Sequence, residues 1–111
     1  MRYLLLICDD PTGEPYDADD DDDAGAWVER LQASSSYVLG DRVRPEDDAV
    51  SVRVRGGQST TTAGPVTRGS ERVVGFDVID AADLDSAVAA AAAHPMARFG
   101  AVEVRPAWPI G

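Results

Sequence analysis

The chain has 111 residues, which fits a single domain spanning residues 1–111. Its ten arginines and twenty acidic residues give a formal net charge of −10, so we expect no nucleic-acid partner, because phosphate contacts need clustered basic side chains. A single cysteine, Cys8, excludes an intrachain disulfide, and no apolar run is long enough for a signal peptide or a membrane span, so we expect a soluble cytoplasmic protein with no membrane partner.

Hydrophobic periodicity and turn residues predict four sheet strands, two helices and a hairpin. The first apolar run is unbroken, which is typical of a central strand buried on both faces. Val50, Val52 and Val54 alternate with polar residues, and Gly56 and Gly57 follow as a two-residue turn, so this segment predicts a peripheral hairpin. In chain order we expect a strand at 3–8, a loop at 9–23, a helix at 24–35, a strand at 37–44, a hairpin at 50–62, a strand at 71–79, a helix at 80–95 and a strand at 101–106.

Capping residues and apolar stripes define the two predicted helices. Asp23 is the expected N-cap of the first, and the second is expected to begin at Asp80, with Asp83 near its third position. Pro95 follows the second helix and favours an end at or just before it. The predicted apolar stripes are Trp27, Val28 and Leu31 in the first helix and Leu84, Val88 and Ala91 in the second.

This order of elements predicts an α+β fold with a ferredoxin-like, split βαβ protomer and an inserted hairpin. Each helix is a crossover between strands, and right-handed crossovers place both helices on one face of the sheet. We expect Asp77, Glu103 and Arg105 on the other face among apolar neighbours, a mixture that suggests a second subunit facing it. We therefore expect a homodimer, with any ligand pocket at the subunit interface.

Several segments resemble the YCII-related, DGPF-domain family over nearly the whole chain, namely "RYLLLI", "SVRVRGGQSTTTAGPV", "VVGFDVIDAADLDSAVAAAA" and "HPMARFGAVEVRPAW". The resemblance implies a dimeric α+β barrel and a bacterial protein, linked in some cases to extracytoplasmic-function sigma factors. Activity in most of the family is unassigned, although some members are small-molecule enzymes that use a His–Asp pair.

The family's Asp-Gly-Pro-Phe motif is degenerate in this chain. "AGPV" at 63–66 keeps Gly64 and Pro65 but replaces the acid with Ala63 and the aromatic residue with Val66. In the stretch that follows, Glu71 alone matches the family pattern. We expect the Gly-Pro corner to be structural here, because proline fixes φ and glycine can adopt φ > 0.

Three other features, His94, the acidic run at 17–23 and Cys8, each have a structural interpretation that we prefer to a functional one. His94 has a pKa suited to a general base, but we interpret it as a capping or surface residue at the end of a helix. The acidic run at 17–23 fits no EF-hand frame, because position 12 is Val28 or Leu31, and we interpret it as a solvated loop. Cys8 is expected to be an inert core residue.

The candidate ligand-binding residues are Glu71, Asp77, Glu103, Arg105, Gly64 and Pro65. Arg105 has the chemistry to bind a carboxylate or phosphate, although an ion pair within the sheet or across a dimer is the favoured interpretation. No metal-ligand spacing or phosphate loop is present in the sequence, so we expect no cofactor. Two functions stay open: a dimeric barrel that binds a small ligand or a partner protein, and a YCII-type small-molecule enzyme using polar residues of the barrel interior.

Overall fold

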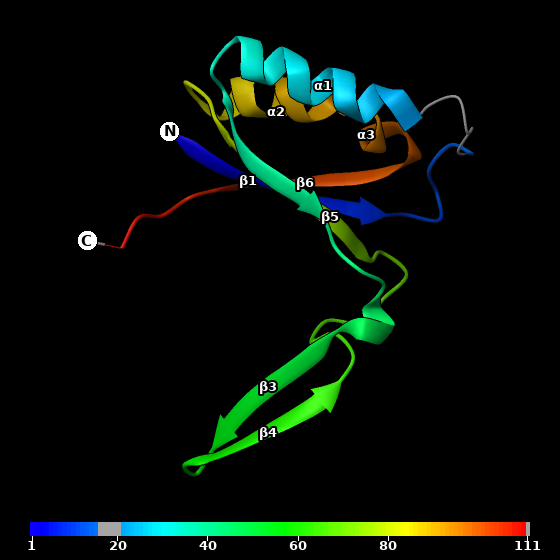
Figure 1. The fold of residues 1–111 in the computed structure, drawn as a ribbon, viewed down its shortest axis with the longest axis vertical. Helices are drawn as coiled ribbons and strands as arrows, with labels where there is room; N and C mark the ends of the chain where they lie inside the picture. The colour runs from blue at the N-terminus through cyan, green and yellow to red at the C-terminus, as the bar shows by residue number, and fades with distance from the viewer. Residues whose placement is uncertain (16–20, 111) are drawn as a thin grey trace.

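The computed structural model describes residues 1–15 and 21–110, and it confirms the expected α+β, ferredoxin-like fold. One antiparallel sheet has the strand order β2-β5-β1-β6, and the helices lie together on one of its faces (Figure 1). The strands are β1 (Arg2–Asp9), β2 (Tyr37–Arg42), β5 (Val73–Asp80) and β6 (Gly100–Pro106), and the helices are α1 (Asp21–Ala33), α2 (Leu84–Ala92) and the short α3 (Met96–Phe99).

The hydrophobic core lies between the sheet and the helices. Strand β1 contributes alternate residues to this helix-facing side, and Trp27 of α1, Ile79 of β5, and Ala87 and Ala91 of α2 complete it. On the opposite side, Leu4 and Leu6 are only half-buried. Strand β1 is therefore central, as expected, but within the single chain only one of its faces is fully buried, because the helices cover only that face. Burial of both faces stays a prediction. We call the uncovered side the open face.

Both helices begin at residues other than those expected. Helix α1 already includes Asp21, so Asp23 lies inside the helix rather than at its N-cap. Helix α2 is capped by Asp83, whose carboxylate accepts a hydrogen bond from the Ser86 backbone N–H at 2.8 Å. Asp80 is instead the last residue of β5, where it pairs with Arg2. Strand pairing thus takes precedence over the sequence signal for a cap at Asp80.

The buried stripe of α2 consists of alanines. Ala87 and Ala91 are buried against the sheet, whereas Leu84 and Val88 are each 49% exposed. The predicted stripe of Leu84, Val88 and Ala91 is therefore wrong in two of its three members. Small side chains one helical turn apart let α2 approach the sheet closely, which explains why the bulkier residues point away.

The inserted hairpin, β3 (Val50–Arg55) and β4 (Gln58–Ala63), forms a separate two-stranded sheet that extends beyond the side of the main sheet away from the helices (Figure 1). Gly56 and Gly57 have positive φ values of 57° and 77°, which confirms the predicted turn. A short 3₁₀ turn, η2 (Glu46–Asp48), precedes the hairpin.

A network of hydrogen bonds closes the base of the hairpin. The Gly64 backbone N–H donates to the Ala49 carbonyl at 2.8 Å, and the Ser51 hydroxyl donates to the Gly64 carbonyl at 2.7 Å. Gly64 has φ of 103°, a conformation that L-residues with side chains rarely adopt. The φ > 0 expected for Gly64 is therefore present at this corner.

The predicted solvated loop at 17–23 lies mostly outside the described residues. The backbone of Asp21–Asp23 forms the first turn of α1. Among the described residues, no helix is long and apolar enough to cross a membrane, and no group of three or more His, Cys, Asp or Glu side chains is placed to hold a metal ion.

Candidate functional site

A cavity of about 420 Å³ opens at the end of the sheet where β2 and β5 meet α1 and the turn before α3. It is formed by residues of a single chain, and the pocket expected at a subunit interface stays a prediction. Its lining is largely apolar, with a small set of polar side chains, which is the usual composition of a small-molecule site. The lining residues used below are Ile7, Val28, Tyr37, Asp77, His94 and Met96.

Asp77 is the buried carboxylate of this cavity. It lies on the helix-facing side of β5 with 8% of its surface exposed, and its Oδ1 accepts a hydrogen bond from the Tyr37 hydroxyl at 2.9 Å. Gly40 of β2 lies directly beside this bond. A Cβ at Gly40 would collide with Asp77 Oδ1 and lie 2.6 Å from the Tyr37 hydroxyl. The absence of a side chain at Gly40 therefore makes room for the Tyr37–Asp77 pair.

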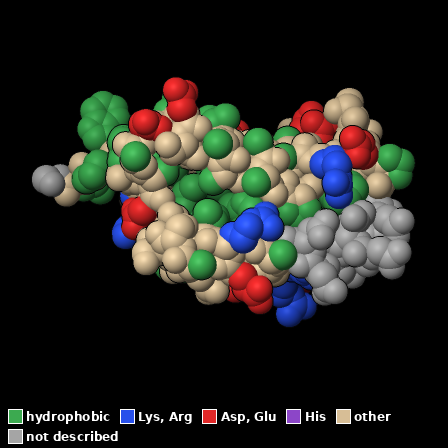
Figure 2. Space-filling view, turned by 90° about the horizontal axis from the view of Figure 1, so that it is seen from above, with side chains coloured by type: hydrophobic (Ala, Val, Ile, Leu, Met, Phe, Trp, Pro, Cys, Tyr) green, Lys and Arg blue, Asp and Glu red, His purple; other side chains and the backbone are tan. Residues whose placement is uncertain are grey.

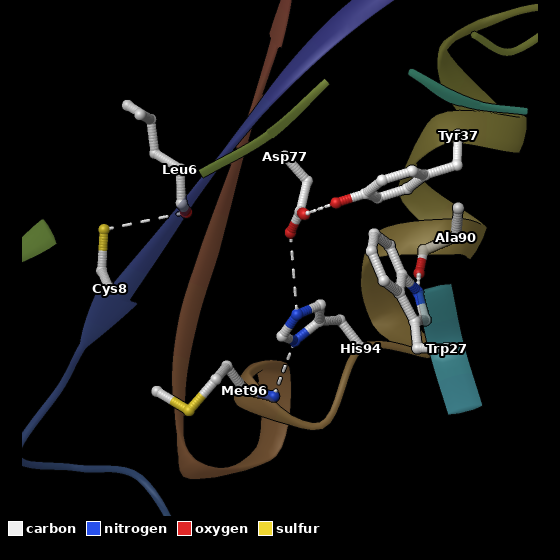
Figure 3. A network of polar contacts seen from close by, with 8 residues as sticks. All are labelled: Leu6, Cys8, Trp27, Tyr37, Asp77, Ala90, His94 and Met96. Carbon is white, nitrogen blue, oxygen red and sulfur yellow. Dashed lines mark hydrogen bonds and ion pairs between the residues drawn. The ribbon is translucent and has the colours of Figure 1, made fainter. Parts of the chain in front are cut away.

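His94 faces Asp77 from the turn after α2 (Figure 3). Its Nδ1 accepts a hydrogen bond from the Met96 backbone N–H at 3.0 Å, and its Nε2 lies 3.8 Å from Asp77 Oδ2. With Nδ1 used as an acceptor, the neutral ring carries its proton on Nε2, directed toward the carboxylate. His94 is only 7% exposed, so the expectation of a surface residue is wrong.

Trp27 forms the wall behind His94. Its indole N–H donates to the Ala90 carbonyl of α2 at 2.8 Å, which fixes the ring between the two helices. The indole meets the His94 ring edge-on, with ring centroids 4.7 Å apart, and it meets Tyr37 edge-on at 6.2 Å. These contacts place an apolar surface against the imidazole. No His94 side chain is visible on the face of the molecule seen in Figure 2, where hydrophobic side chains lie among acidic and basic ones.

Burial controls the protonation of the site. It lowers the pKa of His94 to about 4 and raises the pKa of Asp77, an effect that the Tyr37 hydrogen bond opposes. Burial, together with the Asp77 carboxylate, raises the pKa of Tyr37 to about 12. At neutral pH the site therefore holds a carboxylate, a neutral imidazole and a neutral phenol. The 3.8 Å between His94 and Asp77 is thus not an ion pair at this pH, because burial of the imidazole outweighs the attraction of the carboxylate.

The arrangement offers a donor and an acceptor side by side in a buried cavity. The 3.8 Å between Nε2 and Oδ2 exceeds the length of a direct hydrogen bond, so both atoms keep capacity for another partner. A ligand group that both donates and accepts, such as a hydroxyl, can bond to both atoms.

The structure separates Asp77 from two of its predicted companions. In the strand register, Leu5 lies between Asp77 and Val104, whereas Leu6 lies opposite Glu103. Asp77 therefore faces the helices, and Glu103 and Arg105 lie on the open face, so the prediction that these three share a face is wrong. Arg105 donates to Glu103 at 3.1 Å along the same strand, with both side chains more than half exposed, which matches the favoured interpretation of an ion pair within the sheet.

The other predicted residues lie at the base of the hairpin. Pro65 and Glu71 line a second hollow of about 490 Å³, and Gly64 forms the adjoining corner. Arg72 pairs with Glu46 at 3.3 Å across this hollow. The six predicted residues are therefore distributed over three places, and Asp77 alone belongs to the buried cavity.

Sequence reasoning missed Tyr37, Gly40 and the role of Trp27, and it placed His94 at the surface. The alternation of β5 already put Asp77 on the same side as Ile79, a residue typical of a core. Assigning that side to the helices would have indicated a buried carboxylate in need of partners. No local signal in the sequence identifies Tyr37 or Gly40 as neighbours of Asp77.

Comparison with known families supports the resemblance seen in the sequence. A family model described as YCII-related domain matches residues 1–110. A comparison with curated proteins finds no match.

Proposed function

The chain belongs to the YCII-related domain family, and on this premise we propose that it binds a small molecule in the cavity beside Asp77 and His94. One observation carries the proposal: two buried titratable side chains face each other across 3.8 Å at the wall of a cavity of about 420 Å³. The described residues contain no fully buried side-chain nitrogen or oxygen without a hydrogen-bond partner, so the support for a ligand is geometric. His94 Nε2 and Asp77 Oδ2 lie too far apart to bond directly, and a ligand group in the cavity can bond to both.

The lining defines the chemistry of the expected ligand. Asp77 Oδ2 accepts a hydrogen bond, the His94 Nε2–H donates one, and Ile7, Val28 and Met96 provide apolar surface. The site is therefore suited to a compact, uncharged molecule with a hydroxyl or carbonyl group on an apolar body. A carboxylate ligand is disfavoured, because three aspartates and one arginine line the cavity, namely Asp9, Asp41, Asp77 and Arg42.

A panel of small hydroxy ketones, hydroxy lactones and phenols tests binding. His94 is the only histidine of the chain, so its imidazole NMR signal reports the cavity without assignment. We expect a saturable shift of this signal with at least one panel member, and a roughly tenfold or greater loss of affinity in Asp77→Asn, which removes the charged acceptor. Glu103→Gln on the open face is the matched control and should bind as the parent does. A panel with no saturable response, or equal affinity in both variants, contradicts the proposal.

A second function, a small-molecule enzyme of the YCII type, is favoured by the raised pKa of Asp77. Burial makes this carboxylate a stronger base, while the neutral His94 is placed to donate a hydrogen bond from Nε2 to an oxygen that gains negative charge. The reaction class that fits is proton transfer next to a carbonyl group. Exchange of the α-hydrogen of a bound hydroxy ketone with D₂O is the test. Exchange in the parent but not in Asp77→Asn supports catalysis, and binding without exchange limits the protein to a binding role.

We also infer that the protein is a homodimer. The open face carries Leu4, Leu6, Phe76 and Val78, all half-buried, next to Leu39, which is 50% exposed. An apolar sheet face of this kind is usually covered. Sedimentation at micromolar concentration should give a dimer, and a monomer contradicts the inference. A bacterial origin and a link to an extracytoplasmic-function sigma factor system stay predictions from the resemblance, and a cytoplasmic location stays a prediction from the composition.

A further inference from the structure

The hairpin β3–β4, residues 50–63, is an arm without support from the rest of its own chain. It forms its own two-stranded sheet and extends beyond the open side of the main sheet (Figure 1). The radius of gyration is 15.9 Å, above the roughly 13–14 Å of a compact domain of this length. An isolated two-stranded hairpin is marginally stable in water, so this arm is suited to packing against something else.

One side of strand β3 is apolar and exposed. Val50, Val52 and Val54, which we call the valine stripe, point to the same side of β3, and each is 59–64% exposed. The opposite side carries Arg53 and Arg55 and is suited to solvent. Apart from Ser51, which is buried at the base of the arm, every residue of the two strands is exposed in the single chain, although the valine stripe does not have the composition of a solvated surface.

Charge indicates what covers the valine stripe. Residues 49–70 contain three arginines and no acidic residue, whereas the remainder of the chain contains seven arginines and twenty acidic residues. The acidic bodies of two copies repel each other. The arm is basic, so the body of another copy repels it less than it repels another body. The chain therefore carries its own electrostatic complement, and a second copy supplies both the acidic surface and the apolar open face.

The length of the arm fits this occupant. Two sheets that face each other pack about 10 Å apart, and a six-residue strand spans about 20 Å. If the open faces of two copies oppose each other, each arm projects toward the other copy and is long enough to pass the edge of its sheet. A two-fold axis makes the two contacts equivalent, so both arms are covered at once.

We propose that the valine stripe of each arm packs against the body of a second copy of this chain, in a reciprocal exchange that holds the dimer together. The inference goes beyond ligand binding and rests on the proposed homodimer. It gives the inserted hairpin a role in dimer assembly, in addition to the contact between the two opposed sheets.

Two matched substitutions test the proposal by sedimentation equilibrium. Val52→Arg changes the middle of the valine stripe, and Val88→Arg makes the same change at a similarly exposed valine on α2, on the other side of the sheet. We expect the dimer dissociation constant to rise about tenfold or more for Val52→Arg and to stay within about twofold for Val88→Arg. Circular dichroism checks the fold, and Val52→Thr, which keeps a β-branched side chain, replaces Val52→Arg if the latter does not fold.

A second measurement locates the arm directly. In a mixed dimer of ¹³C-labelled and unlabelled chains, the methyl groups of the valine stripe should give isotope-filtered NOEs to the unlabelled partner. If the parent is a dimer, Val52→Arg dimerises equally tightly and no such NOEs are seen, the proposed arm contact is wrong. The inference of a sheet-to-sheet dimer is then unaffected. A monomeric parent overturns both, and cosedimentation of that monomer with anionic phosphatidylserine vesicles would assign the arm to a membrane surface instead. The NMR binding test at His94 is independent of all these outcomes.

Discussion

Acidification is expected to destabilise the protein through His94, the only histidine of the chain. Its pKa is about 4 in the native state, against 6.5 for the unperturbed side chain. Between these pH values the unfolded chain binds a proton that the native chain does not. The contribution of His94 to the free energy of unfolding is therefore fully present above pH 6.5 and is lost as the pH falls toward 4. The difference between the two pKa values corresponds to a loss of about 3 kcal/mol in the free energy of unfolding once the pH is well below 4. Between pH 7 and pH 4.5 the loss is about 2 kcal/mol.

Asp77 acts in the opposite direction. Its pKa is raised, so the native carboxyl binds a proton at a pH where the unfolded one is still ionised, and acidification restores part of the stability. His94→Asn isolates the histidine contribution, because asparagine still offers an acceptor to the Met96 N–H but does not titrate. We expect the free energy of unfolding in urea to fall between pH 7 and pH 4.5 by about 2 kcal/mol more in the parent than in His94→Asn.

The imidazole NMR signal provides the direct assay. It should show no titration between pH 8 and pH 5.5, because the ring is neutral throughout this range. A midpoint at or above 6.5 would refute the reasoning. It would mean that the attraction of the Asp77 carboxylate, 3.8 Å away, outweighs burial and that a charged His94–Asp77 pair exists at neutral pH.

Tyr37→Phe leaves Asp77 Oδ1 without its donor, so we expect a loss of about 1–3 kcal/mol in urea unfolding and a further rise in the Asp77 pKa, measured by NMR titration. An unchanged Asp77 pKa would contradict the role assigned to the hydroxyl. Asp83→Ala should cost about 1 kcal/mol by loss of the α2 cap, while Asp80→Ala should cost less, and thermal unfolding of both variants distinguishes the observed cap from the one first expected. Ala63→Asp should change stability by no more than about 0.5 kcal/mol, because position 63 is exposed, and unfolding of this variant would show that the residue is buried in the assembly.

The element order, and with it the ferredoxin-like fold, follows from local patterns in the amino-acid sequence. An unbroken apolar run, two helical stripes, a Gly-Gly turn and a Val-rich last strand are local signals, and their order admits few topologies once crossovers are right-handed. The apolar stripe of α1 was also correct, because Trp27 is large enough to dominate the burial of its helix. The stripe of α2 was not, because many alanines leave several helix faces nearly equal in hydrophobicity and the distance to the sheet selects among them.

The site depended on contacts between segments distant in the chain. Asp77 and Tyr37 are 40 residues apart, and they meet because β2 and β5 are neighbours in the sheet. His94 is buried because the chain turns directly from α2 into α3, which packs on the helix-facing side of the sheet (Figure 1). A capping residue at a helix end does not predict this turn. The alternation of a strand specifies which residues share a side, but only tertiary packing decides which side the helices cover. That decision placed Asp77 in the core and left Glu103 and Arg105 on the open face.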